Sequence, residues 1–203
     1  MLVFVLNAGS SSLKYQLIDI KSKELKASGF VERIGIDGIL KHEIGENKKI
    51  TFELPIPTHK EAIELVLRIL TNNETKVINS IDEIKAIGHR VVHGGEHFKG
   101  SVIVDDEVIR KIEELIPLAP LHNPANILGV KICKDLMPKV PNVVTFDTAF
   151  HQTMPMENFL YAVPYADYTE HHVRKYGFHG TSHYYVSREA IKIKKKKDSK
   201  VIV

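Results

Sequence analysis

The sequence predicts an α/β protein in which helices cover a mixed β-sheet. Three features support this fold class: short strand-like runs fill the first third of the chain, helical and strand-like segments alternate after it, and polar residues follow several predicted strands. Strands followed by alternating helices and strands are typical of a sheet packed against helical layers. Ligands bind to such sheets at the C-terminal ends of the strands, so a functional site is expected there.

The composition limits the possible classes of protein. The chain has 203 residues, of which 43% are hydrophobic, which is enough for one large domain or for one domain and part of a second. The net charge is +3, and much of it comes from the run Lys192–Lys200, which we expect to be a solvated helix end and not a nucleic-acid site. Cys133 is the only cysteine and lies in an apolar helical pattern, so an internal disulfide is excluded and a core position is expected.

Membrane attachment is not predicted. No apolar segment approaches the roughly 18–20 residues that span a bilayer. The first residues contain neither a basic leader nor a cleavage site. We therefore expect a cytoplasmic protein without a membrane partner.

The first third of the chain is predicted to form strands, which are short β-rich runs between turn signals: Leu2–Leu6, Leu13–Asp19, Glu24–Ile34 and Thr51–Leu54. Thr58 and Glu61 then form the pattern of a capping box at the start of a helix. Apolar residues recur on one face of this helix, which is expected to end near Asn72.

The second part alternates between strands and helices. Strands are predicted at Ile84–Val92 and Asn142–Phe146. One helix is predicted to begin at Asp105 and to end at Pro117, and a second is predicted over Pro124–Leu136. A third is predicted to begin in the segment Arg174–His183 and to continue through Ala190. The last three residues, Val201–Val203, resemble the beginning of a buried strand, which suggests that the sequence is part of a longer protein; the alternative is an ordinary edge strand.

The turn between the first two predicted strands is a candidate anion site. Residues Asn7–Lys14 (sequence NAGSSSLK) combine backbone N–H groups, three hydroxyls and a lysine within one turn. Such groups suit a phosphate. The alternative is a hairpin turn that is merely rich in turn-forming residues.

Four further segments place polar residues at predicted strand or helix ends: Gly88–Gly95, Leu121–Pro124, Phe146–His151 and Gly177–His183. Taken singly, such an arginine as Arg90 is more often an ion-pair partner, and such histidines as His122 and His179 are more often hydrogen-bonded core residues. Asp147 ends a strand with a carboxylate. Nine of the eleven histidines lie between residues 89 and 183, but their spacing matches no zinc motif.

Together these segments resemble the acetate kinase family in order and spacing. The matching stretches are Asn7–Gln16, Val31–Gly38, Gly88–His97, Pro117–Ile127, Phe146–Pro155 and Tyr161–Tyr184. The resemblance implies the acetate and sugar kinase/Hsc70/actin fold, a ribonuclease H-like mixed sheet with flanking helices. It implies an N-terminal domain over residues 1–150 and the beginning of a second, nucleotide-side domain over residues 151–203, with the active site between them. The implied reaction is reversible phosphoryl transfer from ATP to acetate, giving acetyl phosphate and ADP, with Mg²⁺ or Mn²⁺.

The same resemblance implies roles for individual residues. Those that hold the metal ion and the nucleotide phosphates are Asn7 for the metal and Ser10, Ser12 and Lys14 for the phosphates. Those with catalytic roles are Arg90, His122, Asp147 and His179. Those that bind acetate are Arg90 for its carboxylate and Val92, Leu121 and Phe178 for its methyl group. A carboxylate nucleophile is ionised near neutral pH and needs no general base, so we interpret Asp147 first as a metal-binding or orienting group.

Several functional alternatives remain open. Family members are about twice as long, and their second half supplies the adenosine-binding segment, a second arginine and a glutamate for magnesium, so this chain is expected to be inactive by itself. The resemblance also implies that family members are homodimers whose contacts lie mostly in that half, so dimerisation of this chain is not expected. The alternatives are a non-catalytic module that binds acetate or phosphate, a propionate or butyrate kinase, and a sugar kinase of the same superfamily.

Overall fold

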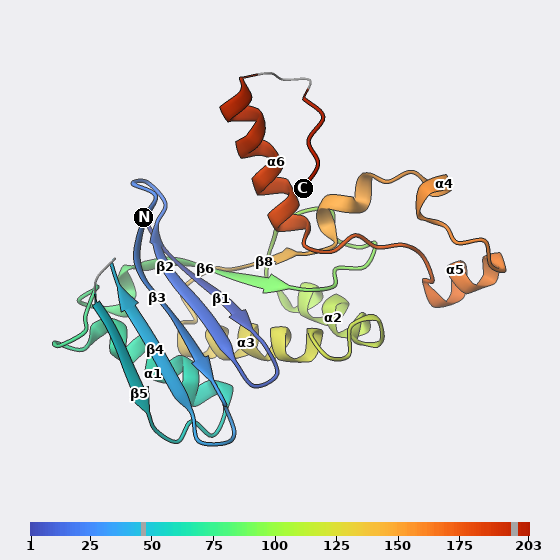
Figure 1. The fold of residues 1–203 in the computed structure, drawn as a ribbon. Coiled ribbons are helices and arrows are strands. Elements are labelled where there is room, and N and C mark those ends of the chain that lie inside the picture. The colour runs from blue at the N-terminus through green and yellow to red at the C-terminus, as the bar shows by residue number, and fades with distance from the viewer. Residues whose placement is uncertain (46–47, 196–198) are drawn as a thin grey trace.

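A computed structural model describes residues 1–45, 48–195 and 199–203. Within them, a single mixed sheet of eight strands has the order β5-β4-β3-β2-β1-β6-β8-β7 (Figure 1). The strands are β1 (Leu2–Ala8), β2 (Leu13–Asp19), β3 (Glu24–Glu32), β4 (Ile39–Ile44), β5 (Lys48–Glu53), β6 (Ile84–Val91), β7 (Val102–Ile103) and β8 (Asn142–Phe146). Strands β1 to β5 form an antiparallel meander, whereas β1, β6 and β8 run parallel. The predicted fold class is confirmed.

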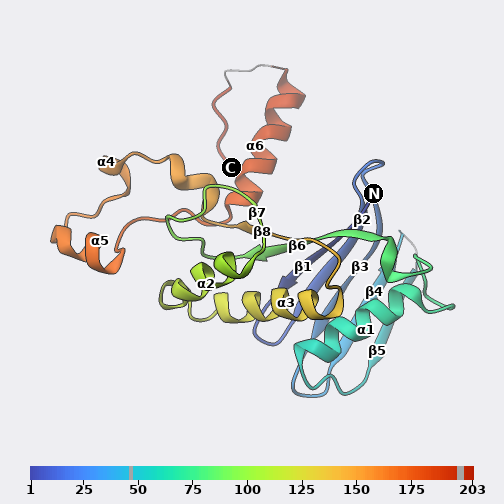
Figure 2. The ribbon, with the colours of Figure 1, turned by 180° about the vertical axis from the view of Figure 1, so that it is seen from behind.

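Helices cover one face of this sheet. The α-helices are α1 (His59–Thr71), α2 (Asp106–Glu114), α3 (Asn123–Leu136), α4 (Met156–Phe159), α5 (Tyr165–His171) and α6 (Gly180–Lys194). Short 3₁₀ turns lie at η1 (Ile81–Glu83), η2 (Ile116–Leu118) and η3 (Ala149–Thr153). Helices α1 and α3 lie side by side on one face, as the view from behind shows, and α6 projects from the β8 end of the sheet (Figure 2).

The core forms where the strands face the α1 and α3 layer. Side chains of β1 and β2 alternate, so that Phe4, Leu6, Leu13 and Leu17 are at most 1% exposed. Because the side-chain period of a strand is two, their neighbours lie on the opposite face of the sheet. Asn7, Lys14 and Arg90 are therefore on the face that α1 and α3 leave uncovered.

Strand β4 was not predicted, and a buried histidine explains why. The strand alternates in burial, but its second buried position is His42 instead of an apolar residue. The His42 Nδ1 atom lies 2.5 Å from the hydroxyl of Tyr15 on β2, so one of its two buried ring nitrogens has a hydrogen-bond partner. The sequence pattern therefore lacks the usual apolar alternation. The short strand β7 was also missed, and β5 begins at Lys48, before the predicted Thr51.

The expected capping box at the start of α1 is not observed. Thr58 does cap α1, but its hydroxyl accepts from the Lys60 N–H and donates to the Glu61 carboxylate, so a reciprocal capping box does not form there. A capping box forms instead at Ser80, whose N–H donates to Glu83 at 3.2 Å.

The end of the described chain also differs from the expectation. Residues 199–203 form no strand, and Ile202 is fully exposed. The predicted solvated run Lys192–Lys200 begins within α6, but residues 196–198 lie outside the described residues. Cys133 is fully buried, as predicted. No helix in the described part of the chain is long and apolar enough to cross a membrane.

Candidate active site

The predicted site residues gather where three parallel strands end. Asn7 lies near the end of β1, Arg90 near the end of β6, and Asp147 directly after β8. These strands are neighbours in the order β1-β6-β8, so residues about 140 positions apart in sequence reach one edge of the sheet. This is the position at which α/β sheets bind ligands.

Arg90 and Asp147 form a two-pronged ion pair at this edge. The Arg90 Nε donates to Asp147 Oδ1 at 3.0 Å, and Nη2 donates to Oδ2 at 2.6 Å. The Asp147 side chain is 4% exposed and that of Arg90 is 40% exposed. The hydrogen bond to Asp147 raises the pKa of Arg90 above its ordinary value, against the effect of partial burial. The pair fixes the plane of a guanidinium whose other edge faces solvent.

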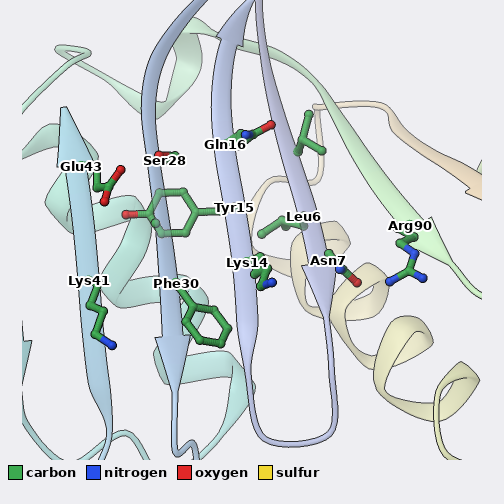
Figure 3. Close-up of a pocket in the computed structure, with 12 residues that line it drawn as sticks. Leu6, Asn7, Lys14, Tyr15, Gln16, Ser28, Phe30, Lys41, Glu43 and Arg90 are labelled. Carbon is green, nitrogen blue, oxygen red and sulfur yellow. The ribbon is translucent and has the colours of Figure 1, made fainter. Parts of the chain in front are cut away.

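Asn7, Lys14 and Arg90 line a common pocket on the uncovered face of the sheet (Figure 3). Asn7 and Lys14 are directly paired across the β1–β2 hairpin. The Lys14 ammonium lies 5.3 Å from the centre of the Phe30 ring, which holds it over β3. Three of the predicted residues thus present an amide, an ammonium and a guanidinium to one shallow surface.

The turn after β1 is held from both sides. The Gly9 N–H donates to the Ser12 carbonyl at 2.8 Å, which closes the turn. The ring Nε2 of His59, at the start of α1, lies 2.6 Å from the Gly9 carbonyl, which can only accept the hydrogen bond. Ser10 is exposed and Ser12 is half-buried. The hydroxyls predicted to bind phosphate are therefore displayed on a braced turn.

The residues predicted to surround the acetate methyl group do not form an enclosed pocket. Val92 is half-buried, Phe178 is 41% exposed and Leu121 is 79% exposed. Phe178 packs against the ring of His93, with ring centres 5.6 Å apart. The structure thus places Val92 and Phe178 near the end of β6, whereas Leu121 is largely exposed on the surface.

The two predicted catalytic histidines each precede a helix. His122 is the N-cap residue of α3 and His179 that of α6, and both side chains are exposed. The backbone of His179 has a φ of 55°, in the left-handed region. The next N–H, that of Gly180, donates to the Asp147 carbonyl at 2.8 Å. Helix α6 therefore begins directly on the strand end that carries Asp147.

The segment before α6 is anchored by a buried arginine. The Arg174 guanidinium, 7% exposed as a residue, is paired with the Glu96 carboxylate and lies 3.6 Å from the centre of the Phe159 ring. Tyr168 also donates to Glu96, at 3.1 Å. This cluster ties the chain around α4 and α5 to the turn that follows β6.

Sequence reasoning missed the buried polar residues behind the site. Asn123 and Asn126 on α3 are 0% and 4% exposed, and His93 is 2% exposed. The single side-chain amide of Asn123 makes two hydrogen bonds to the backbone of His93: the His93 N–H donates to Asn123 Oδ1, and Asn123 Nδ2 donates to the His93 carbonyl, each at 3.1 Å. Two asparagines three positions apart on the apolar face of a helix were the available signal.

Burial keeps two histidines of this region neutral. Burial lowers the pKa of His89 to about 4, although its hydrogen bond to Asn142 acts in the opposite direction, and burial also lowers the pKa of His93 to about 4. In the unfolded chain both histidines have their ordinary pKa of about 6.5, so they become protonated as the pH falls below that value. The unfolded state therefore binds more protons between these values.

Stability is accordingly expected to fall as the pH drops from 6.5 towards 4. The His89→Gln variant keeps a side-chain donor for Asn142 but has no group that titrates in this range, so it is expected to lose about half of the slope. Urea unfolding of both proteins at half-unit pH intervals measures it. An unchanged slope in the variant would contradict the prediction.

The described residues contain no group of three histidine, cysteine, aspartate or glutamate side chains arranged to hold a metal ion. Mg²⁺ prefers oxygen ligands, keeps several waters and is usually bound through one or two protein groups together with substrate phosphates. The amide oxygen of Asn7, beside a turn that can display phosphate oxygens, fits this mode of binding.

Comparison with known proteins agrees with this geometry. The sequence profile of the Acetokinase family matches residues 2–203. The acetate kinase of Clostridium beijerinckii is 57% identical over 197 residues, which are 97% of this chain and 49% of that protein. The acetate kinase of Thermotoga maritima is 53% identical over 205 residues, covering 100% of this chain and 51% of that protein.

Solved structures give the same result. The crystal structure of Porphyromonas gingivalis acetate kinase matches with a TM-score of 0.91 at 48% identity, covering 95% of this chain and 48% of that one. A propionate kinase from Francisella tularensis matches with a TM-score of 0.90 at 41% identity, covering 98% and 50%. The chain spans about half the length of the curated relatives it matches. It belongs to the acetokinase family.

Proposed function

We propose that this chain provides the acetate-binding half of an acetate kinase, which transfers a phosphoryl group reversibly between ATP and acetate. The observation that carries the proposal is the ion pair between Arg90 and Asp147 at the ends of β6 and β8, beside Asn7 and Lys14. A guanidinium grips a carboxylate in two places, and phosphoryl transfer depends mostly on positioning and on charge.

In this proposal each predicted residue keeps a defined role. Arg90, oriented by Asp147, binds the acetate carboxylate and the transferring phosphoryl group. Ser10, Ser12 and Lys14 bind nucleotide phosphates, and Asn7 holds Mg²⁺, which when bound neutralises phosphate charge.

The second group of roles concerns the acyl side. His122 and His179 donate hydrogen bonds to the equatorial phosphoryl oxygens, while Val92, Leu121 and Phe178 contact the methyl group. The division into a domain of residues 1–150 and the beginning of another over residues 151–203 belongs to the same proposal. A cytoplasmic location and the absence of a dimer remain predictions.

The exposed site explains why we expect no turnover from this chain by itself. Leu121, His122, Phe178 and His179 are all exposed, so nothing in the described chain excludes water from the reacting groups. Exclusion of water by closure is a general requirement of such phosphoryl transfers. With acetate, Mg-ATP and hydroxylamine, the 203-residue chain is expected to form no acetyl hydroxamate above background.

Joining the chain to the second half of the Clostridium beijerinckii acetate kinase should restore the reaction, since that relative is 57% identical over the matched half. An Arg90→Met version of the fusion is the control and should be inactive. Turnover by the isolated chain at the rate of a full-length relative would contradict the need for a second half.

A propionate kinase is the second candidate, favoured by the propionate kinase of known structure that matches at a TM-score of 0.90. One methylene contributes only about 1–3 kcal/mol of discrimination in an apolar pocket. The kcat/KM of the fusion for acetate, propionate and butyrate separates these possibilities. Calorimetry of the isolated chain with acetate, phosphate and Mg-ATP tests the alternative of a non-catalytic module, which tight Mg-ATP binding would favour.

A further inference from the structure

The sheet has a gap in its hydrogen-bond ladder at the candidate site. Strand β1 is paired with β2 as far as Ala8, and β6 is paired with β8 as far as Val91. The pairing between β1 and β6, however, ends at Leu6 and His89. The two central parallel strands therefore separate only over their last residues, which is where they carry Asn7 and Arg90.

The side chain of Asn126 fills this gap. Its Nδ2 donates to the Ala8 carbonyl at 2.7 Å, and its Oδ1 accepts from the Val92 N–H at 3.0 Å. A carboxamide has the same donor and acceptor as a peptide unit, so the side chain replaces the missing rung of the ladder. Asn126 is 4% exposed, so these backbone groups have little access to water.

Close packing of α3 fixes where this amide lies. A Cβ atom on Gly129, one turn after Asn126, would lie 3.0 Å from the Cβ of Ala8. The helix is therefore in direct contact with the end of β1. Its amide spans from that strand to β6 with little freedom to move.

We propose that Asn126 is a positioning residue that sets the separation between the phosphate-binding turn after β1 and the acetate-binding end of β6. Through Ala8 it acts on Asn7 and Gly9, and through Val92 it acts on Arg90. The consequence for ligands rests on the proposed function, whereas the bridge between the strands does not.

Two substitutions separate the halves of this bridge. Asn126→Asp keeps an acceptor for the Val92 N–H but offers no donor to the Ala8 carbonyl, so only the β1 side should be released. Asn126→Ala removes both bonds and should release both sides. The control is Asn142→Ala, because Asn142 is 5% exposed and also makes two hydrogen bonds, to His89 Nε2 at 2.7 Å and to the Val140 carbonyl at 3.1 Å. Asn142 is the first residue of β8, so it lies at the end of that strand away from the candidate site.

The first measurement is amide hydrogen exchange and chemical shifts by NMR on the 203-residue chain without ligand. Asn126→Ala is expected to accelerate exchange at Val92 by at least about tenfold and to shift the signals of Gly9 and Ser10. Asn126→Asp should shift the turn signals but leave Val92 protected. Asn142→Ala should change neither group of signals. The bridge is refuted if both Asn126 variants leave Val92 exchange and the turn signals as in the unchanged chain.

The second measurement is calorimetric titration with acetate and, separately, with inorganic phosphate. Both Asn126 variants are expected to bind acetate about tenfold more weakly, since small displacements of binding groups have effects of this order or larger. Asn142→Ala should bind as the unchanged chain does. Equal acetate binding by all proteins would overturn the positioning role. Failure of the unchanged chain to bind either ligand would count against the proposed function, while the NMR result would still decide the bridge.

Discussion

Replacing Arg90 with methionine is expected to lower the free energy of unfolding of the chain by about 3 kcal/mol at neutral pH, because it leaves the buried carboxylate of Asp147 without its charged partner. The Asp147 side chain is 4% exposed, and Arg90 meets both of its oxygens. Methionine has a similar length but offers no donor to the carboxylate. Arg90 itself is 40% exposed, which keeps the expected loss at the lower end for such pairs.

Urea unfolding followed by circular dichroism measures this loss. Arg110→Met is the matched control, because Arg110 pairs with Glu114 on the surface, with side chains 60% and 51% exposed. Such exposed pairs contribute about 0–1 kcal/mol. A loss at Arg90 no greater than that at Arg110 would contradict the prediction.

A double variant tests whether the loss comes from the uncompensated carboxylate. Asp147→Leu in the Arg90→Met background removes the remaining charge, and replacing both members of a buried pair by apolar groups is often nearly neutral. Stability is therefore expected to recover by most of the 3 kcal/mol that Arg90→Met removes. Acetate binding should stay lost in both variants, which separates the structural contribution of the pair from its proposed role in binding.

The sequence was sufficient to predict the strand ends that carry the site. Strand β1, the hairpin turn, β6 and β8 have plain apolar patterns, and polar residues follow them directly. Because parallel strands end at one edge of a sheet, Asn7, Arg90 and Asp147 could be expected near one another. The same reasoning predicted α3 over Pro124–Leu136, within one residue of its observed start.

The contacts that hold this edge together could not be predicted in the same way. His59 is hydrogen-bonded to Gly9, which is 50 positions away in sequence, and Asn126 is hydrogen-bonded to Ala8, which is 118 positions away. Such contacts depend on how a helix packs against the sheet, which a local pattern does not contain. His42 illustrates a second kind of failure: this buried polar residue interrupts the apolar alternation of β4, so a strand that is otherwise regular could not be recognised. Both failures concern polar side chains in apolar surroundings.

Gly180→Ala is expected to lower the free energy of unfolding by about 2–3 kcal/mol, because the added methyl group has no room and must displace backbone. A Cβ atom at this position would lie 2.4 Å from the Asp147 carbonyl oxygen and 2.9 Å from the Cβ of Phe150. The N–H of Gly180 also donates to that same carbonyl. The substitution therefore forces the start of α6 away from the end of β8.

The sign of this effect distinguishes the close contact from helix propensity. Gly180 is the first residue of α6, and replacing a helical glycine by alanine usually stabilises a helix by up to about 1 kcal/mol. Gly100→Ala is the control, since no atom lies within 4 Å of its added Cβ, and it should change stability by less than about 0.5 kcal/mol. Thermal unfolding compares the two variants, and limited proteolysis tests whether the chain around His179 is released. A Gly180→Ala protein as stable as the unchanged chain, and cut no faster near His179, would mean that α6 does not depend on this contact. If the helix is released, His179 and Phe178 lose their fixed position relative to Asp147, and acetate binding should weaken even though Arg90 is untouched.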